Sequence, residues 1–178
     1  PRGRILDRNG VVLARDEPVL TLAMDYREML LLHLMYGGDL SDTERSFLRS
    51  YVHSRRIEAR RNESPRLAEL ETLYAALQNE PDTDAVARLP GLAETRLDSL
   101  RDAAGRPVDL LQRRIEGVIS KVRAIHAALP KIRLIYEETI PHELVTDVPV
   151  EGIAFVEANP ILFPGVTVNT LHKRRLPE

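Results

Sequence analysis

A serine followed by a lysine one helical turn later is a pair of residues that can perform nucleophilic catalysis, because the lysine can take part in proton transfer from the serine. Such acyl-serine chemistry uses Ser-x-x-Lys, together with Ser-x-Asn and with Lys-Thr-Gly or Lys-Ser-Gly. None of these patterns occurs in the sequence. The third residue after each serine is Glu44, Arg49, His53, Ile57, Leu67, Asp102 or Arg123. We therefore expect no catalysis by this chain.

Imidazole and carboxylate groups do not indicate a metal or cofactor site either. His142-Glu143 with Asp147 is the one cluster of this type, and a turn between two elements explains it adequately. Asp82-Thr83-Asp84 is similar to the start of a calcium loop, but the glycine and closing glutamate of an EF-hand are missing. No glycine-rich phosphate loop is present. The histidines lack metal-ligand spacing on a helix and stand at His33, His53, His126, His142 and His172.

The most specific pattern in the chain lies in residues 1–14. Ile5-Leu6 leads into Asp7-Arg8-Asn9-Gly10, and Val11-Val12-Leu13 leads out. Asn and Gly accept the positive φ angles of a hairpin turn, and an Asp carboxylate can accept hydrogen bonds from amides of the same turn. The pattern predicts a β-hairpin.

The complete string Arg-Gly-x-Ile-x-Asp-Arg-Asn-Gly-x-x-Leu-Ala resembles the first signature of class B penicillin-binding proteins, just outside their membrane anchor. In that family the hairpin belongs to a non-catalytic pedestal, often called the dimerisation domain, beneath the transpeptidase domain. Phe163-Pro164-Gly165-Val166 resembles the turn into the closing strand of the pedestal. The segment that follows this closing strand departs from the family pattern, because it has the sequence Arg174-Arg175-Leu176-Pro177 where Arg-Tyr-Tyr-Pro is usual. The matching positions are Arg2, Gly3, Asp7, Arg8, Asn9, Gly10, Leu13, Ala14, Pro164 and Gly165.

For these positions the resemblance implies structural work at an interface between domains. Arg2, Asp7 and Arg8 would form an ion-pair and hydrogen-bond cluster that holds the hairpin against neighbouring strands or the next domain. Gly3 and Gly10 would serve backbone geometry. None of the positions is expected to be catalytic or to bind a metal.

The resemblance also implies a function and partners. The chain would be the periplasmic pedestal of an elongation-type class B penicillin-binding protein, and the intact protein would be a peptidoglycan D,D-transpeptidase. Expected partners are its own transpeptidase domain, a SEDS-family glycan polymerase and the periplasmic scaffold of the elongation machinery, and the chain could form a homodimer. No nucleic acid and no cofactor are expected. Membrane contact would come through an N-terminal anchor preceding Pro1, at the periplasmic face of the bacterial inner membrane.

Length and composition are compatible with these expectations. The chain has 178 residues, enough for one domain or for one domain with an inserted subdomain. Its net charge of −2 does not demand nucleic acid or anionic lipid as a partner. Cysteine is absent, which excludes disulfides and thiolate metal sites and leaves the compartment open. No apolar run reaches the ~20 residues of a membrane helix, and residues 29–35 read as a buried helix.

The middle of the chain, residues 27–130, is predicted to be helical. Gly37-Gly38 ends a short first helix. Ser41 and Glu44 form a capping box that begins a second helix. Ser64-Pro65 begins a third, because proline is favoured in the first turn.

The clearest helix follows Pro107, where apolar residues between Val108 and Leu129 hold one face for several turns. A further helix is predicted over residues 92–104, with Pro90-Gly91 as its boundary at the start. Both helices should pack against those that precede them.

The two ends of the chain are predicted to be strands. Residues 19–24 should pair with the arms of the hairpin, after a break at Pro18. Residues 132–140 alternate in polarity and predict another strand. A short helix over residues 150–157 and a strand from Val166 follow.

The predicted fold class is therefore α+β. Residues 1–26 and 131–178 would form a small β-sheet base from both ends of the chain, and residues 27–130 would be an inserted helical head that offers an apolar-rimmed surface to partners.

Two alternatives remain open. One is a free-standing periplasmic scaffold or assembly factor with the same fold and no attached enzyme. The other is a helical module that binds nucleic acid, favoured by the arginines between Arg55 and Arg61. A solvated helix end explains these arginines more simply, because Glu44, Glu58 and Glu63 lie among them.

Overall fold

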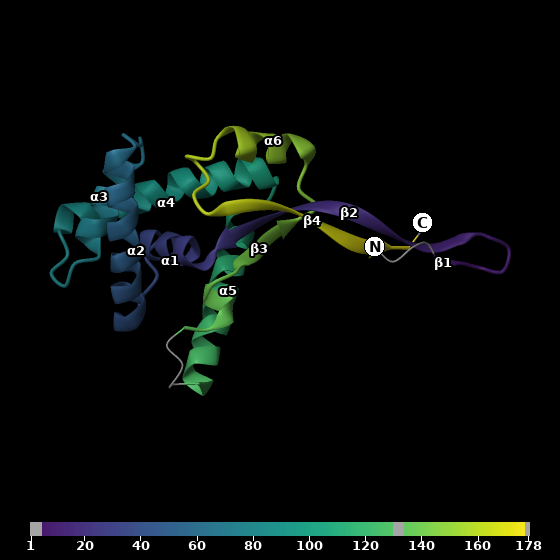
Figure 1. The fold of residues 1–178 in the computed structure, drawn as a ribbon, viewed down its shortest axis with the longest axis horizontal. Helices are drawn as coiled ribbons and strands as arrows, with labels where there is room; N and C mark the ends of the chain where they lie inside the picture. The colour runs from purple at the N-terminus through teal and green to yellow at the C-terminus, as the bar shows by residue number, and fades with distance from the viewer. Residues whose placement is uncertain (1–4, 130–133, 177–178) are drawn as a thin grey trace.

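The computed structural model describes residues 5–129 and 134–176. A long β-arm projects from a helical head (Figure 1). The arm is a ribbon of β2 (Val12–Asp25) and β4 (Val166–Arg175), with β1 (Ile5–Leu6) at its far end. The α+β fold class is confirmed.

β2 is the central strand of a four-stranded antiparallel sheet. β4 runs along β2 over residues 15–24. β3 (Pro141–Thr146) pairs with the inner end of β2, at residues 21–25, and β1 pairs with the outer end, at Val12 and Ala14. Both ends of the chain therefore build the sheet, as predicted.

The helices form the head and leave the arm uncovered (Figure 1). They are α1 (Tyr26–Met35), α2 (Asp42–Arg61), α3 (Leu67–Ala76), α4 (Thr83–Ala104), α5 (Val108–Ala128), α6 (Val150–Ala158) and the 3-10 helix η1 (Tyr136–Glu138).

α1 lies at the centre of the head. Its side chains Met29, Leu30 and Met35 are fully buried, because α2, α4 and α5 pack around them. The same hydrophobic core continues into the inner end of the sheet through Leu22 and Leu144. Head and sheet therefore share one core, and the division of the chain at residues 26 and 130 stays a prediction.

Several helix ends follow local signals that the sequence shows. Ser41 and Glu44 form the predicted capping box, in which Glu44 Oε2 accepts from the Ser41 amide at 2.8 Å. Gly105 ends α4 in the left-handed conformation, with φ of +61°. α5 begins after Pro107, and the residues it buries belong to the predicted stripe: Leu111, Ile115, Val118, Ile119 and Val122.

The boundary predicted at Pro90-Gly91 is wrong. α4 runs through this dipeptide and begins after Asp82, whose carboxylate accepts from the Ala85 amide at 3.0 Å. Pro90 is exposed, whereas Leu89 and Ala93 beside it are buried. Packing of that buried face outweighs the hydrogen bond that a proline removes from a helix. The start of the third helix is shifted too, since α3 begins at Leu67.

The break predicted at Pro18 is also wrong. β2 is continuous through Pro18, which lies opposite His172 of β4. Residues 19–24 pair with β4 and β3, not with the hairpin arms. Near Pro18 the described strands pair with β2 on one edge only, through β4, and proline is tolerated in a strand where an edge needs no amide donor.

Residues 134–140 do not form the predicted strand; they contain η1. Glu138 Oε2 accepts from the Ile135 amide at 2.9 Å, a local bond that competes with strand pairing. Leu134 and Tyr136, two of the apolar residues in the alternating pattern, are 54% and 72% exposed. The strand begins later, at β3, and residues 132 and 133 of the prediction lie outside the described residues.

Candidate functional site

The predicted hairpin turn is present, and Asp7 organises it. Asp7 Oδ1 accepts hydrogen bonds from the amides of Asn9 and Val11, both at 2.8 Å. The Gly10 amide donates to the Asp7 carbonyl oxygen at 3.1 Å, and Gly10 has φ of +82°. Asp7 and Gly10 therefore shape the turn in the way their residue types predict.

The other signature residues fall in different surroundings. Arg8 is exposed beside the turn, Leu13 is 48% exposed, and Ala14 is buried. Arg2 and Gly3 lie outside the described residues. The ion-pair cluster of Arg2, Asp7 and Arg8 therefore stays a prediction.

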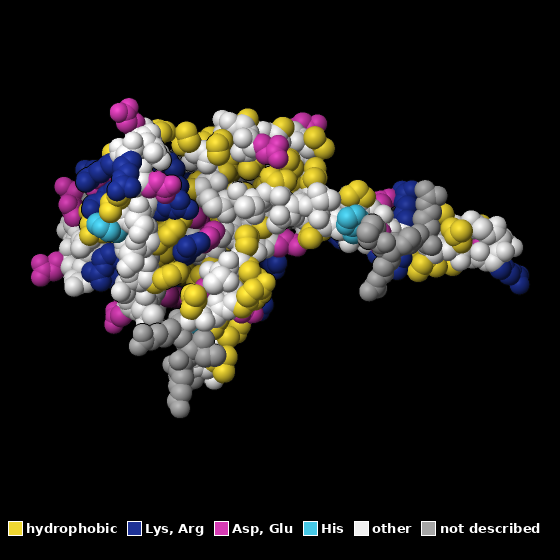
Figure 2. All heavy atoms as spheres, viewed as in Figure 1, with side chains coloured by type: hydrophobic (Ala, Val, Ile, Leu, Met, Phe, Trp, Pro, Cys, Tyr) yellow, Lys and Arg dark blue, Asp and Glu magenta, His cyan; other side chains and the backbone are white. Residues whose placement is uncertain are grey.

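The far part of the arm exposes apolar side chains (Figure 2). We call these residues the arm's apolar surface, and each is at least 42% exposed: Ile5, Leu6, Val11, Leu13, Leu171 and Leu176. Charged pairs such as Asp16 with Arg174, at 3.2 Å, connect the two strands between the tip and Leu171. The arm thus has a ribbon held by strand pairing and a tip with little core of its own.

Pro164 and Gly165 lie where the arm meets the head. The Gly165 carbonyl oxygen accepts from the Asp25 amide at 2.9 Å, at the start of α1. Gly165 has φ of +67°, and a Cβ there would lie 2.6 Å from Glu28 Cγ. Conformation and close approach both require glycine, which gives this signature residue a physical role.

The first turn of α1 is fixed at the same junction. Asp25 caps the helix by accepting from the Arg27 amide at 2.9 Å, and the Arg27 guanidinium donates to the same carboxylate. Burial alone would raise the pKa of Asp25, but the hydrogen bonds from Arg27 outweigh it and hold the pKa below its ordinary value of 3.8.

Beside the junction lies a group of charged residues that we call the buried ion cluster: Glu28, Tyr51, Arg66, Glu69 and Arg96. Glu28 is 1% exposed and accepts from Arg96 Nη1 at 3.0 Å and from the Tyr51 hydroxyl at 2.8 Å. Glu69 accepts from Arg66 at 3.1 Å and from Arg96. The cluster joins α1, α2, α3 and α4.

The protonation of Tyr51 is set by its burial. Burial, with the neighbouring Glu28 carboxylate, raises the pKa of Tyr51 to about 12. The Tyr51 hydroxyl therefore keeps its proton at neutral pH and donates to Glu28. Buried charges need partners of opposite charge, so each member of the cluster depends on the others.

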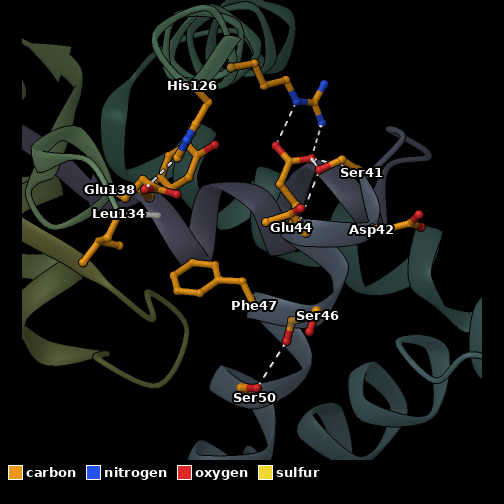
Figure 3. Close-up of a pocket in the computed structure, with 12 residues that line it drawn as sticks. Ser41, Asp42, Glu44, Ser46, Phe47, Ser50, His126, Leu134 and Glu138 are labelled. Atoms are coloured by element: carbon orange, nitrogen blue, oxygen red, sulfur yellow. Dashed lines mark hydrogen bonds and ion pairs between the residues drawn. The ribbon is translucent and has the colours of Figure 1, made fainter. Parts of the chain in front are cut away.

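A hollow with a volume of about 940 Å³ lies between α2, α5 and the residues around η1 (Figure 3). We call it the α2–α5 groove. Arg123 Nε donates to Glu44 Oε1 at 2.9 Å on one wall. His126 Nε2 lies 3.0 Å from Glu138 Oε2 on the other.

A family model supplies the assignment. The model described as the penicillin-binding protein dimerisation domain matches residues 1–178. The chain belongs to this family. A search of curated proteins gives no significant match. The penicillin-binding protein dimerisation domain is a non-catalytic domain.

The histidine and acidic residues of this dimerisation domain do not assemble a metal site in residues 5–129 and 134–176. His142 Nε2 lies 2.6 Å from the Glu137 carbonyl oxygen, and its ring stands edge-on to Tyr26. Asp147 pairs with Lys173 at 3.2 Å. Among the described helices, none is both long enough and apolar enough to cross a bilayer.

The arginines of α2 engage carboxylates of the domain itself. Arg55 pairs with Glu58 at 2.9 Å, and Arg56 and Arg60 share Glu71 at 3.2 Å and 2.5 Å. Figure 2 shows basic side chains gathered over α2 and α3, with acidic side chains among them. The pairing supports the interpretation of a solvated helix face.

Sequence reasoning missed the buried ion cluster. Its members lie far apart in the chain, and charged residues on helices usually face solvent. One signal was available, because Glu28 stands inside the apolar run of α1, where a charge needs a buried partner.

Proposed function

We propose that this domain is the pedestal of an elongation-type class B penicillin-binding protein. The arm would hold the transpeptidase domain, and the head would contact partners in cell-wall elongation. The observation that carries the proposal is the arm's apolar surface. Apolar side chains grouped at the end of a projecting element mark a surface that another domain covers.

The junction makes the arm suitable for positioning. β2 continues directly into α1, and Gly165 of the returning chain lies against the first turn of α1. Glu28 then connects this turn to the other head helices through the buried ion cluster. A displacement of the head is therefore transmitted to the arm by buried contacts.

The head carries a second exposed apolar area, over α6 and the turn that follows it (Figure 2). Its exposed residues are Val150, Phe155, Ile161 and Leu162. We infer that this area faces the SEDS-family glycan polymerase or the periplasmic scaffold of the elongation machinery. The intact protein would be a D,D-transpeptidase anchored at the periplasmic face of the inner membrane.

Partner binding at the head would regulate the enzyme by shifting the orientation of the arm. Such allostery requires that the partner bind one orientation more tightly than another. The junction is the place where the two orientations would differ.

The proposal is tested with charge substitutions on the two surfaces of this domain. Leu13→Asp with Leu171→Asp should weaken association with the separately expressed transpeptidase domain, measured by calorimetry. Val150→Asp with Leu162→Asp is the matched pair and should weaken binding of the polymerase or scaffold instead. Arm variants that keep full association would contradict the proposal.

A stand-alone scaffold remains the alternative, and the reading frame beyond Glu178 distinguishes the two. A pedestal attached to an enzyme predicts a following domain with Ser-x-x-Lys. A frame that ends without such a domain would favour the scaffold.

A homodimer is a second candidate function, favoured by the dimerisation described for the family. Light scattering at several concentrations measures it directly. A mass that stays at the 20.1 kDa of one chain would count against it.

A further inference from the structure

The α2–α5 groove has the size of a ligand site, and the pedestal role does not use it. Its volume of about 940 Å³ is within the ~300–1,000 Å³ typical of small-molecule pockets. Most of its lining side chains are hydroxylic or charged (Figure 3). They are Ser41, Asp42, Thr43, Glu44, Ser46, Ser50, Arg123, His126 and Glu138, with Tyr26, Phe47 and Leu134 as the apolar part.

The Tyr26 hydroxyl points to a ligand in this groove. Tyr26 is 1% exposed, lines the groove, and forms no hydrogen bond with any residue among 5–129 and 134–176. The hydroxyl oxygen itself is not one of the fully buried polar atoms, so it can be reached from the groove and is free to donate to a ligand. Burial, with Glu44 and Glu138 nearby, raises the pKa of Tyr26 well above its ordinary value, so the hydroxyl is a donor.

The charges of the groove argue against an anionic ligand. The lining has three carboxylates, of Asp42, Glu44 and Glu138, against the single guanidinium of Arg123. Arg123 already donates to Glu44 through Nε and Nη2, at 2.9 Å and 3.0 Å. A phosphate or carboxylate would therefore meet net negative charge.

The walls also lack the features that bind peptides. Peptide recognition uses an open strand edge, a continuous apolar groove or a cluster of arginines. Here helices α2 and α5 form the walls, and serine and threonine hydroxyls interrupt the apolar surface. Hydroxyls that both donate and accept, beside paired charges and the ring of Phe47, suit a ligand that is uncharged and rich in hydroxyl groups.

We propose that the α2–α5 groove binds an uncharged glycan segment. The apolar face of one sugar ring packs on Phe47, and a sugar hydroxyl accepts from Tyr26. Glu44, held by Arg123, and His126, held by Glu138, line the groove on either side.

The experiment is an NMR titration of the ¹⁵N-labelled chain with chitotetraose as the probe. Amide shifts should be confined to the start of α2, the end of α5 and η1. Tyr26→Phe removes one hydroxyl and should weaken binding about 3- to 10-fold. Phe47→Ala should weaken it about 10-fold. Leu110→Ala, an exposed residue near the start of α5, is the control and should leave affinity unchanged.

Three outcomes would overturn the proposal. One is the absence of shifts at millimolar chitotetraose. Another is binding that Phe47→Ala and Tyr26→Phe leave intact. The third is saturation of the groove by a neutral Gly-Ser peptide but not by the glycan. Circular dichroism checks that each variant is folded. If Tyr26→Phe is not folded, the affinity of Phe47→Ala alone decides the test.

Discussion

The arm and the head of this dimerisation domain use charge in opposite ways. In the arm, the Arg15 side chain is 61% exposed although it pairs with Glu17. In the head, the side chains of Glu28 and Arg96 are 2% and 9% exposed. An exposed ion pair contributes little to stability, whereas breaking a buried one leaves a charge without a partner. The head should therefore determine stability, and the arm should determine what the domain attaches to.

The strongest test of this comparison is Glu28→Gln. It leaves Arg96 and Arg66 buried beside a neutral group, so we expect the free energy of unfolding to fall by about 3 kcal/mol. Urea denaturation measures the change. Glu94→Gln, on the exposed face of α4, is the control and should change it by less than ~0.5 kcal/mol. Equal effects of the two variants would show that the cluster does not stabilise the head.

The junction between the two regions should be nearly as sensitive. Gly165→Ala forces a side chain into a left-handed conformation and places its Cβ against Glu28, so we expect a loss of about 2 kcal/mol. Gly117→Ala in α5 is the matched substitution, because its Cβ would meet nothing within 4 Å. It should stabilise the domain by about 0.5–1 kcal/mol. Thermal melts of both variants measure the changes in stability. A Gly165→Ala variant as stable as the parent domain would argue against tight packing between arm and head at this junction.

Acid should remove the stabilisation that comes from the carboxylates that cap the helices. The pKa values of Asp25 and Glu44 lie below their ordinary values of 3.8 and 4.5, because hydrogen bonds from Arg27 and Arg123 outweigh the effect of burial. Their contribution is complete above these ordinary values and is lost as the pH falls through the lower pKa values of the folded state.

Asp25→Asn should therefore lower stability at pH 7 by about 1 kcal/mol and by less at pH 3. Urea unfolding at both pH values measures the difference. A deficit that is the same at pH 7 and pH 3 would contradict the assignment.

The smallest effect on stability is expected in the arm. Leu13→Ser and Leu171→Ser change exposed side chains, so the free energy of unfolding should move by no more than ~0.5 kcal/mol. The same variants should lose association with the transpeptidase domain. A large loss of stability would mean that these residues are packed within the domain, and the comparison between arm and head would fail.

Local sequence signals were sufficient where the interactions that decide a structure are local. The Asp7 turn, the capping box of Ser41 and Glu44, and the start of α5 each depend on residues within a few positions of one another. Gly165 was named through the family resemblance alone, and its positive φ is a finding of the structure. The sequence by itself therefore determined the hairpin, most helix ends, the α+β class and, through the hairpin signature, the family.

Tertiary structure decided the rest, because burial depends on which elements meet. α4 continues through Pro90 because the residues beside it face a core that other helices complete. Residues 134–140 contain η1 and no strand because the Glu138 carboxylate accepts from the Ile135 amide and lies against His126. The pairing of Glu28 with Arg96 joins residues far apart in the chain. No short stretch contains both partners of such a contact, so only the folded chain shows the buried ion cluster and the α2–α5 groove.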